Sequence, residues 1–245
     1  VLHQEARFAA EDFNDRLNIP FIELRRLYQT DKIANQYQAL GAALGVKFED
    51  EIYREEAGKV LETFREVCPD PIFAIGECMN GDPLELSLAL LKYGFQVAEI
   101  YATITAENFV YLKQIEKLSP DTKVFSNMEP TMLYYDEEKS GVTLTIGKDA
   151  GYYHQNCPNL LWNEDRQPYG YAGVRRLFEA LRQVMSGEQV LTGSQIQLGK
   201  QLVSEVKVAE IHGKSTDRFE AECIISERNR QEANKEKKEQ EAKLC

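Results

Sequence analysis

Residues 72–101 read IFAIGECMNGDPLELSLALLKYGFQVAEIY and predict a strand, a helix and a second strand in that order. The apolar run at 72–75 has the length of a buried strand. Asp82 followed by a proline, with a glutamate three residues after the aspartate, is typical of the start of a helix. The helical spacing of leucines ends at Gly94, and residues 96–101 form the next apolar run. A helix that connects two buried strands indicates that the strands are parallel.

The same alternation continues toward the carboxyl end of the chain. We expect further strands at 123–125, 142–146 and 159–162, and helices near 105–118, 130–138 and 172–185. Thr105 is the expected cap of the first of these helices. Strands that alternate with helices predict an α/β protein with a doubly wound parallel sheet of the Rossmann-like kind.

The amino-terminal part of the chain ends at a break formed by Cys-Pro-Asp-Pro at 68–71. Before this break we expect a helix around 8–17, a strand at 19–24 and helices at 30–44 and 48–67. We predict four parts: the end of a preceding α/β domain at 1–47, a connecting helix at 48–68, a Rossmann-like domain at 69–187, and a tail at 188–245. The tail is rich in Glu, Lys and Arg, so we expect a charged, largely helical or disordered segment, or else a coiled-coil contact with a partner. Because the chain begins at Val1 within a predicted helix, we expect a fragment of a longer protein.

The composition argues against several classes of function. A net charge of −11 disfavours nucleic acid or an anionic membrane surface as a partner, because both attract basic proteins. The sequence has no apolar run long enough to cross a bilayer and no signal-peptide pattern, so we expect a cytoplasmic protein. Its five cysteines include no CxxC pair, which fits a reducing compartment and supports neither a zinc ribbon nor a disulfide framework.

Candidate binding residues follow the predicted strands, because parallel sheets bind ligands outside the carboxyl ends of their strands. They are Glu77, Cys78 and Asn80 after the first strand, Asn127 and Glu129 after the third, and Asn163, Asp165, Arg166 and Gln167 after the fifth. Cys78 lies before a helix start, which favours a thiolate, but a lone cysteine is more often structural. Arg166 is suited to clamp a carboxylate or phosphate, or to pair with a neighbouring acid and fix the loop. The sequence contains no GxGxxG or Walker A loop, so we expect no phosphate cradle.

His154 and Cys157 are candidate metal ligands. They lie three residues apart, and imidazole and thiolate both bind transition metals. Two ligands do not complete a site, and the sequence supplies no second Cys or His pair. With only three histidines and no GxSxG motif, a Ser/His/Asp arrangement has little support.

Several segments together resemble the component 1 family of nitrogenase. They are NIPFIEL at 18–24, LGAALGV at 40–46, FAIGECMNGDPLELSLALLKYGFQVAEIYAT at 73–103, KVFSN at 123–127 and LLWNEDRQPYGYAGVRRLFEALRQVM at 160–185. The most specific element is the Pro-Tyr-Gly-Tyr loop before the last helix, and the resemblance covers about residues 1–187. That span is similar to the carboxy-terminal portion of a component 1 subunit. The family includes iron-molybdenum protein subunits, cofactor-assembly scaffolds and dark-operative protochlorophyllide reductases.

The resemblance implies a nitrogenase-like oxidoreductase subunit that binds a metallocluster or a tetrapyrrole-type substrate and accepts electrons from an ATP-dependent iron-sulfur reductase. It also implies pairing with a related component 1 subunit, in a homo- or hetero-oligomer, and an iron-sulfur or other metallocluster in the full-length assembly. The family's cofactor ligands, a Cys and a His, align near Leu2 or His3 and near Leu161, and leucine cannot coordinate a metal.

This departure from the family pattern keeps a second hypothesis open, a non-catalytic cofactor-assembly scaffold or binding module. Under either hypothesis we expect no activity from the fragment alone. A sugar- or nucleotide-binding protein of another family would require a phosphate-binding loop that the sequence lacks.

Overall fold

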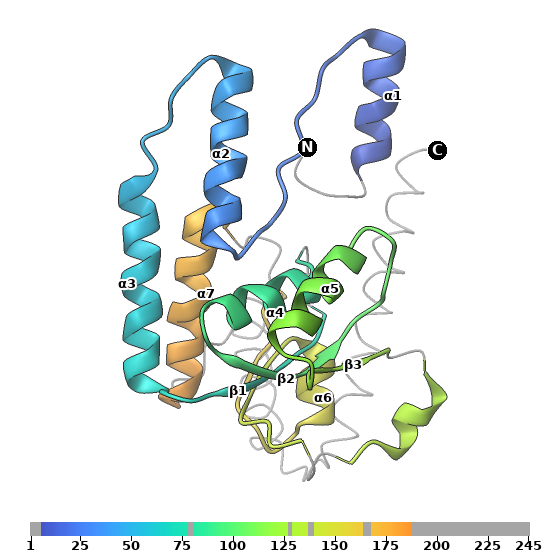
Figure 1. Ribbon diagram of the computed structural model, residues 1–245, viewed down its shortest axis with the longest axis vertical. Helices are drawn as coiled ribbons and strands as arrows, with labels where there is room; N and C mark the ends of the chain where they lie inside the picture. The colour runs from blue at the N-terminus through green and yellow to red at the C-terminus, as the bar shows by residue number, and fades with distance from the viewer. Residues whose placement is uncertain (1–5, 78–80, 127–128, 137–139, 164–167, 188–245) are drawn as a thin grey trace, which may run out of the picture. The chain divides into compact units, whose positions relative to one another are not determined.

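The computed structural model describes residues 6–77, 81–126, 129–136, 140–163 and 168–187 (Figure 1). The chain divides into two units, Val1–Val190 and Leu191–Cys245. Every helix and strand named below belongs to the first unit. The predicted tail at 188–245 lies outside the described residues.

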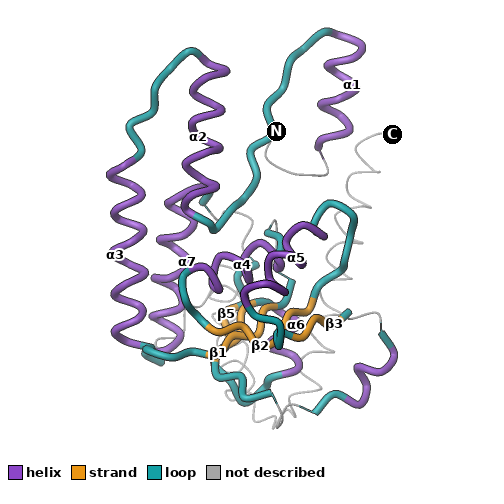
Figure 2. The backbone as a smooth tube through the Cα atoms, in the orientation of Figure 1, coloured by secondary structure: helices purple, strands orange, loops and turns teal. Residues whose placement is uncertain are grey.

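A five-stranded parallel sheet forms the centre of the first unit, in the order β3-β2-β1-β4-β5 (Figure 2). Its strands are β1 (Ile72–Ile75), β2 (Gln96–Tyr101), β3 (Lys123–Phe125), β4 (Leu144–Ile146) and β5 (Asn159–Leu160). The chain moves outward from β1 to β3 and then returns to the other side of β1 to form β4. The predicted α/β fold with a doubly wound parallel sheet is therefore confirmed.

Helices cover both faces of the sheet (Figure 2). The helices α4 (Pro83–Lys92) and α5 (Phe109–Leu118) lie on one face, whereas α6 (Lys148–Tyr153) and the 3-10 helix η2 (Pro130–Tyr134) lie on the other. Side chains of β1 alternate between the faces: Phe73 and Ile75 join the large core under α4, and Ala74 joins a small core under α6. Burial on both faces explains why the strands are apolar runs.

The remaining helices are α1 (Arg7–Leu17), α2 (Thr30–Leu44), α3 (Glu51–Val67) and α7 (Gly170–Met185). The helices α3 and α7 lie side by side (Figure 1). The Phe64 side chain of α3 is fully buried, and its ring lies 5.5–6.4 Å from the rings of Phe73, Phe95 and Phe178. The helix α3, which the sequence predicted to connect two domains, thus packs against α7. The predicted domain boundaries at 47/48 and 68/69 stay predictions.

The strand predicted at 19–24 is wrong, because residues 18–29 form neither helix nor strand. None of the described strands pairs with this segment, and an unpaired strand has no hydrogen-bonded ladder to hold it. Side chains fix the segment instead. The Arg25 amide donates to Gln36 Oε1 at 2.8 Å, and Gln36 Nε2 donates to the Arg25 carbonyl at 3.1 Å.

Two predicted helix starts have different outcomes. Asp82 caps α4 as expected, since its Oδ1 accepts a hydrogen bond from the Leu84 amide at 2.9 Å. The carboxylate of Glu85 accepts hydrogen bonds from residues 28 and 29, and these bonds do not complete a capping box. Thr105 does not cap α5, because the helix begins four residues later and the Asn108 side chain accepts from the Thr105 amide at 2.8 Å.

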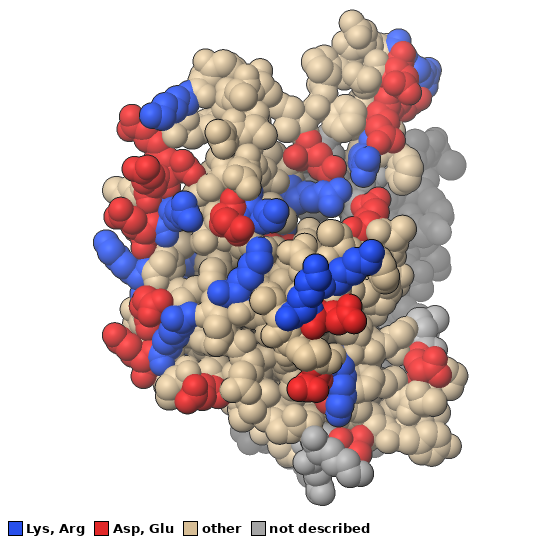
Figure 3. All heavy atoms as spheres, in the orientation of Figure 1, with Lys and Arg blue, Asp and Glu red and all other residues tan. Residues whose placement is uncertain are grey.

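The second face of the sheet carries shorter helices than expected. The helix predicted at 130–138 is a 3-10 helix over Pro130–Tyr134, and residues 137–139 lie outside the described part of the chain. The helix α6 was not predicted, since its sequence KDAGYY holds a glycine and too few apolar residues for a helical period. No described helix is long and apolar enough to cross a bilayer. On the face shown in Figure 3, basic side chains are scattered among acidic ones and form no continuous stripe.

Candidate functional site

The strand order changes direction between β1 and β4, and the carboxyl ends of these two strands meet. The Gly76 amide, after β1, donates to the Ile146 carbonyl oxygen at 2.6 Å. A Cβ on Gly147 would lie 2.8 Å from the Glu77 carbonyl oxygen, and a Cβ on Gly76 would lie 2.6 Å from the Ala150 amide nitrogen. Glycine at both positions allows the strand ends and α6 to approach closely. Open parallel sheets bind ligands at this point of the edge.

Oxygen-bearing side chains line this carboxyl edge. The exposed carboxylate of Glu77 accepts a hydrogen bond from the Thr103 hydroxyl, which follows β2, at 3.3 Å. Asn108 Nδ2 donates to the Thr103 carbonyl at 3.2 Å, which fixes the loop between β2 and α5. Lys148 is exposed at the start of α6. The edge therefore offers a carboxylate, a hydroxyl and an ammonium group from three strand ends.

The loop after β5 is anchored at both ends. Trp162 is 6% exposed, has φ +48° and donates from Nε1 to the Tyr28 hydroxyl at 2.6 Å. At the other end, Gly170 has φ +62°, and a Cβ there would collide with the Tyr37 hydroxyl. A left-handed backbone at a tryptophan is uncommon and is held here by burial and the indole hydrogen bond. Such a conformation beside a sheet edge is typical of binding loops.

The predicted binding residues fall into two groups. Glu77 and Asn163 lie at the carboxyl edge, both exposed, and Glu129 lies exposed at the start of η2, beyond β3. The other six lie outside the described residues: Cys78, Asn80, Asn127, Asp165, Arg166 and Gln167. The structure adds Thr103, the first polar residue after β2, whose hydroxyl donates to Glu77.

A second group of polar side chains lies on the face of the sheet covered by α6, and we name it the Glu99 cluster: Glu99, Tyr101, Tyr135 and His154. Glu99 Oε2 lies 2.8 Å from the Tyr101 hydroxyl, 2.6 Å from the Tyr135 hydroxyl and 3.0 Å from His154 Nε2. Glu99 is 2% exposed and His154 is 1% exposed. A register shift between Phe73 and Ala74 of β1 skips one residue of β2 and places Glu99 and Tyr101 on this face.

The electrostatics of the Glu99 cluster keep the carboxylate charged. Burial alone would raise the pKa of Glu99, but hydrogen bonds from His154, Tyr135 and Tyr101 outweigh it and lower the pKa below its ordinary value. Burial and the neighbouring carboxylate raise the pKa of Tyr101 and of Tyr135. Sequence reasoning found only His154, although a glutamate inside an apolar strand is itself a signal.

The predicted metal ligands His154 and Cys157 have different hydrogen-bond partners. Cys157 Sγ donates to the Val142 carbonyl oxygen at 3.2 Å, whereas His154 faces Glu99. Among the described residues, no three His, Cys, Asp or Glu side chains form a group that would hold a metal ion. Leu161 is half-buried, and its side chain has no atom that could bind a metal. The described part of the carboxyl edge thus does not fit a metallocluster, because its ligands are oxygen and amine rather than thiolate or imidazole.

A pocket of about 490 Å³ lies at the opposite, amino-terminal edge of the sheet. Its lining includes Ile72, Gln96 and Thr122, which precede or begin β1, β2 and β3. Parallel sheets bind ligands at the other edge, so this pocket is not the candidate site.

The fold and the carboxyl edge invite comparison with known proteins. No protein-family profile and no curated protein sequence matches the chain. A solved structure described as nitrogenase Cp1 at pH 6.5 is similar, with a TM-score of 0.58 and 20% sequence identity. The fold is nitrogenase-like. The match covers 79% of this chain and 46% of the nitrogenase chain, so the chain spans about half of that protein's length.

Proposed function

We propose that this chain is part of a nitrogenase-like component 1 subunit whose carboxyl sheet edge contributes to binding a tetrapyrrole-type substrate. The observation that carries the proposal is the nitrogenase-like fold over 79% of the chain, with Glu77 and Thr103 together at the edge where such sheets bind ligands. In this function the subunit accepts electrons from an ATP-dependent iron-sulfur reductase in the cytoplasm and pairs with a related subunit.

The ligands described at the carboxyl edge favour a tetrapyrrole over a metallocluster held by this chain. The hydroxyl and the ammonium group donate hydrogen bonds to the propionates and carbonyls of a tetrapyrrole, and the carboxylate binds its ring N–H groups or a central magnesium ion. They are poor ligands for iron-sulfur clusters, which require thiolates.

The second candidate is a non-catalytic cofactor-assembly scaffold or binding module. It is favoured by one specific observation, the leucine at 161 where the family has a ligating histidine. A scaffold binds its ligand without turning it over, so the two candidates differ in their dependence on a reductase.

The test is anaerobic purification of the natural protein that carries this sequence, followed by iron analysis, visible spectroscopy and titration with a magnesium porphyrin. We expect saturable porphyrin binding, which E77Q weakens about tenfold if the carboxylate binds the magnesium ion of the porphyrin. The matched control is E66Q, an exposed carboxylate on α3. Reductase-dependent and ATP-dependent loss of the bound porphyrin's spectrum would indicate catalysis, and binding without turnover would indicate a scaffold. A protein that binds neither porphyrin nor iron would contradict both candidates.

A further inference from the structure

The Glu99 cluster has more short polar contacts than it has protons. Five contacts of 2.6–3.2 Å join Glu99 Oε2, the Tyr101 and Tyr135 hydroxyls and His154 Nε2. Each hydroxyl carries one proton and the imidazole nitrogen carries at most one, so at most about three protons serve these contacts. When these three protons serve the three contacts to Glu99 Oε2, the two contacts of His154 Nε2 with the tyrosine hydroxyls have no proton between them.

The spacing of the four donor atoms matches the coordination sphere of a metal ion. Five of their six separations lie between 2.6 and 3.2 Å. An ion central to four atoms about 3 Å apart lies about 1.8 Å from each, slightly less than the bond length of about 2 Å that oxygen and nitrogen ligands form. A small outward movement of the side chains brings the donor atoms to that bond length.

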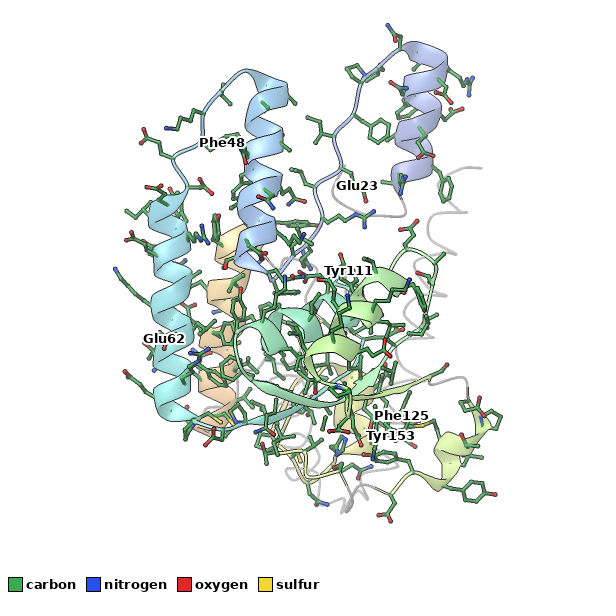
Figure 4. The ribbon with its side chains drawn as sticks, in the orientation of Figure 1. Glu23, Phe48, Glu62, Tyr111, Phe125 and Tyr153 are labelled. Atoms are coloured by element: carbon green, nitrogen blue, oxygen red, sulfur yellow. The ribbon has the colours of Figure 1, made fainter. Side chains whose placement is uncertain are left out.

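The surroundings hold the donors in place. Tyr101 and Glu99 are fixed by β2, His154 by the end of α6, and Tyr135 by the end of η2. The ring of Tyr101 lies between Phe125, at 5.4 Å, and Tyr153, at 4.9 Å, both labelled in Figure 4. Three independently packed elements and an aromatic wall make a preorganised site.

We infer that Glu99, Tyr101, Tyr135 and His154 form a binding site for one trivalent metal ion of the ferric class. Two phenolates and one carboxylate carry three negative charges, which a trivalent cation neutralises in a buried position. Three hard oxygen donors with one imidazole favour ferric iron over ions that prefer thiolates. On binding, each phenol loses its proton to solvent and forms an oxygen–iron bond, so two protons leave for each ion bound.

The site differs from the metal site expected from the sequence. Cys157 takes no part, because its thiol donates to the Val142 carbonyl. Tyr135 is only half-buried, so the ion reaches the site by displacement of one side chain. The site lies on the covered face of the sheet and does not depend on the function proposed for the carboxyl edge.

The test is titration of the full chain with ferric nitrilotriacetate, followed by visible absorption. Phenolate bound to ferric iron has a charge-transfer band that neither the free protein nor the iron salt shows, and we expect it to saturate at one iron per chain. Gallium(III), which has no such band, should bind with the same stoichiometry and produce the ultraviolet difference spectrum of ionised tyrosine.

The variants Y135F and E99Q keep the size of each side chain, and we expect at least a tenfold loss of iron affinity in both. The matched control Y134F changes the neighbouring tyrosine, which is 87% exposed, and should bind iron as the unaltered protein does. Circular dichroism checks that each variant is folded. No band at stoichiometric iron, or a band of equal strength in Y135F and Y134F, would overturn the inference and indicate adventitious binding only.

Discussion

The carboxylate of Glu85 joins the amino-terminal segment to the sheet unit, and its replacement by glutamine is the sharpest test of this packing. Glu85 is 1% exposed in the first turn of α4. Its Oε2 accepts a hydrogen bond from the Tyr28 amide at 2.9 Å, and its Oε1 accepts from Gln29 Nε2 at 3.0 Å. E85Q preserves the shape of the side chain but removes the charge and one of the two acceptor oxygens.

The expected magnitude follows from the pKa of Glu85. Burial raises this pKa from 4.5 to about 7, although the hydrogen bonds from Tyr28 and Gln29 act in the opposite direction. Because the pKa is higher in the folded protein, the stabilising contribution of the protonated carboxyl is fully present below about pH 4.5 and is lost as the pH rises through about 7. The loss amounts to about 3 kcal/mol in total, of which about 2 kcal/mol falls between pH 5.5 and 8.5.

The assay is urea unfolding at several pH values across that range, monitored by tryptophan fluorescence. Trp162 is the only tryptophan of the chain, is buried, and donates to the hydroxyl of Tyr28, so its emission reports on this region. We expect the free energy of unfolding of the unaltered protein, relative to that of E85Q, to fall by about 2 kcal/mol from pH 5.5 to 8.5. The control E62Q removes an exposed carboxylate, labelled in Figure 4, and should show no such trend. A constant difference between the unaltered protein and E85Q at all pH values would refute the reasoning.

Three further pairs of substitutions test the packing around the sheet by thermal or urea unfolding. Gly147→Ala should destabilise the protein by about 2–4 kcal/mol, because its φ is +97° and the new Cβ would lie 2.8 Å from the Glu77 carbonyl oxygen. Gly141→Ala, at φ +68° with nothing within 4 Å, should cost only about 1 kcal/mol, and equal losses would contradict the close approach of β1 and β4. Phe64→Ala should cost about 3–5 kcal/mol, against less than about 1 kcal/mol for Val67→Ala at an exposed position, because only the former leaves a cavity among aromatic rings. Asp82→Ala should cost about 1 kcal/mol through loss of the α4 cap; D82N should recover most of it, and a D82N variant as unstable as D82A would show that the cap is not the cause.

The β1-α4-β2 unit was predictable because each of its signals is local. An apolar run, a capping aspartate before a proline and a glycine at the end lie within one short segment. The predicted strand at 19–24 is wrong because a strand depends on a neighbouring strand, which is not a local signal. Its apolar residues are spaced as in a strand, but the presence of a neighbouring strand is a property of the whole fold.

The helix α6 was not predicted, because tertiary contacts rather than helix propensity stabilise it. Gly151 costs the helix stability, yet a Cβ at this position would collide with the side chain of Asn159 in β5. Close packing of α6 against the sheet thus requires a residue that weakens the sequence signal for a helix.

Only those residues of the candidate site that directly follow a strand could be predicted from the sequence. Strand ends located Glu77 and Asn163 at the carboxyl edge, because every parallel strand ends there. The Glu99 cluster was not predictable, since Glu99 and His154 are 55 residues apart and meet only through the strand order and a register shift in β2. The short spacing of His154 and Cys157 in the sequence suggested that both bind one metal ion. In the folded chain, His154 contacts Glu99, and Cys157 donates to the Val142 carbonyl oxygen.

The two candidate sites share one structural element. The helix α6 follows Gly147 at the carboxyl edge and ends at His154 in the Glu99 cluster. This short helix packs against β1, β2, β4 and β5, so the positions of both Lys148 at the carboxyl edge and His154 in the Glu99 cluster depend on the packing of α6.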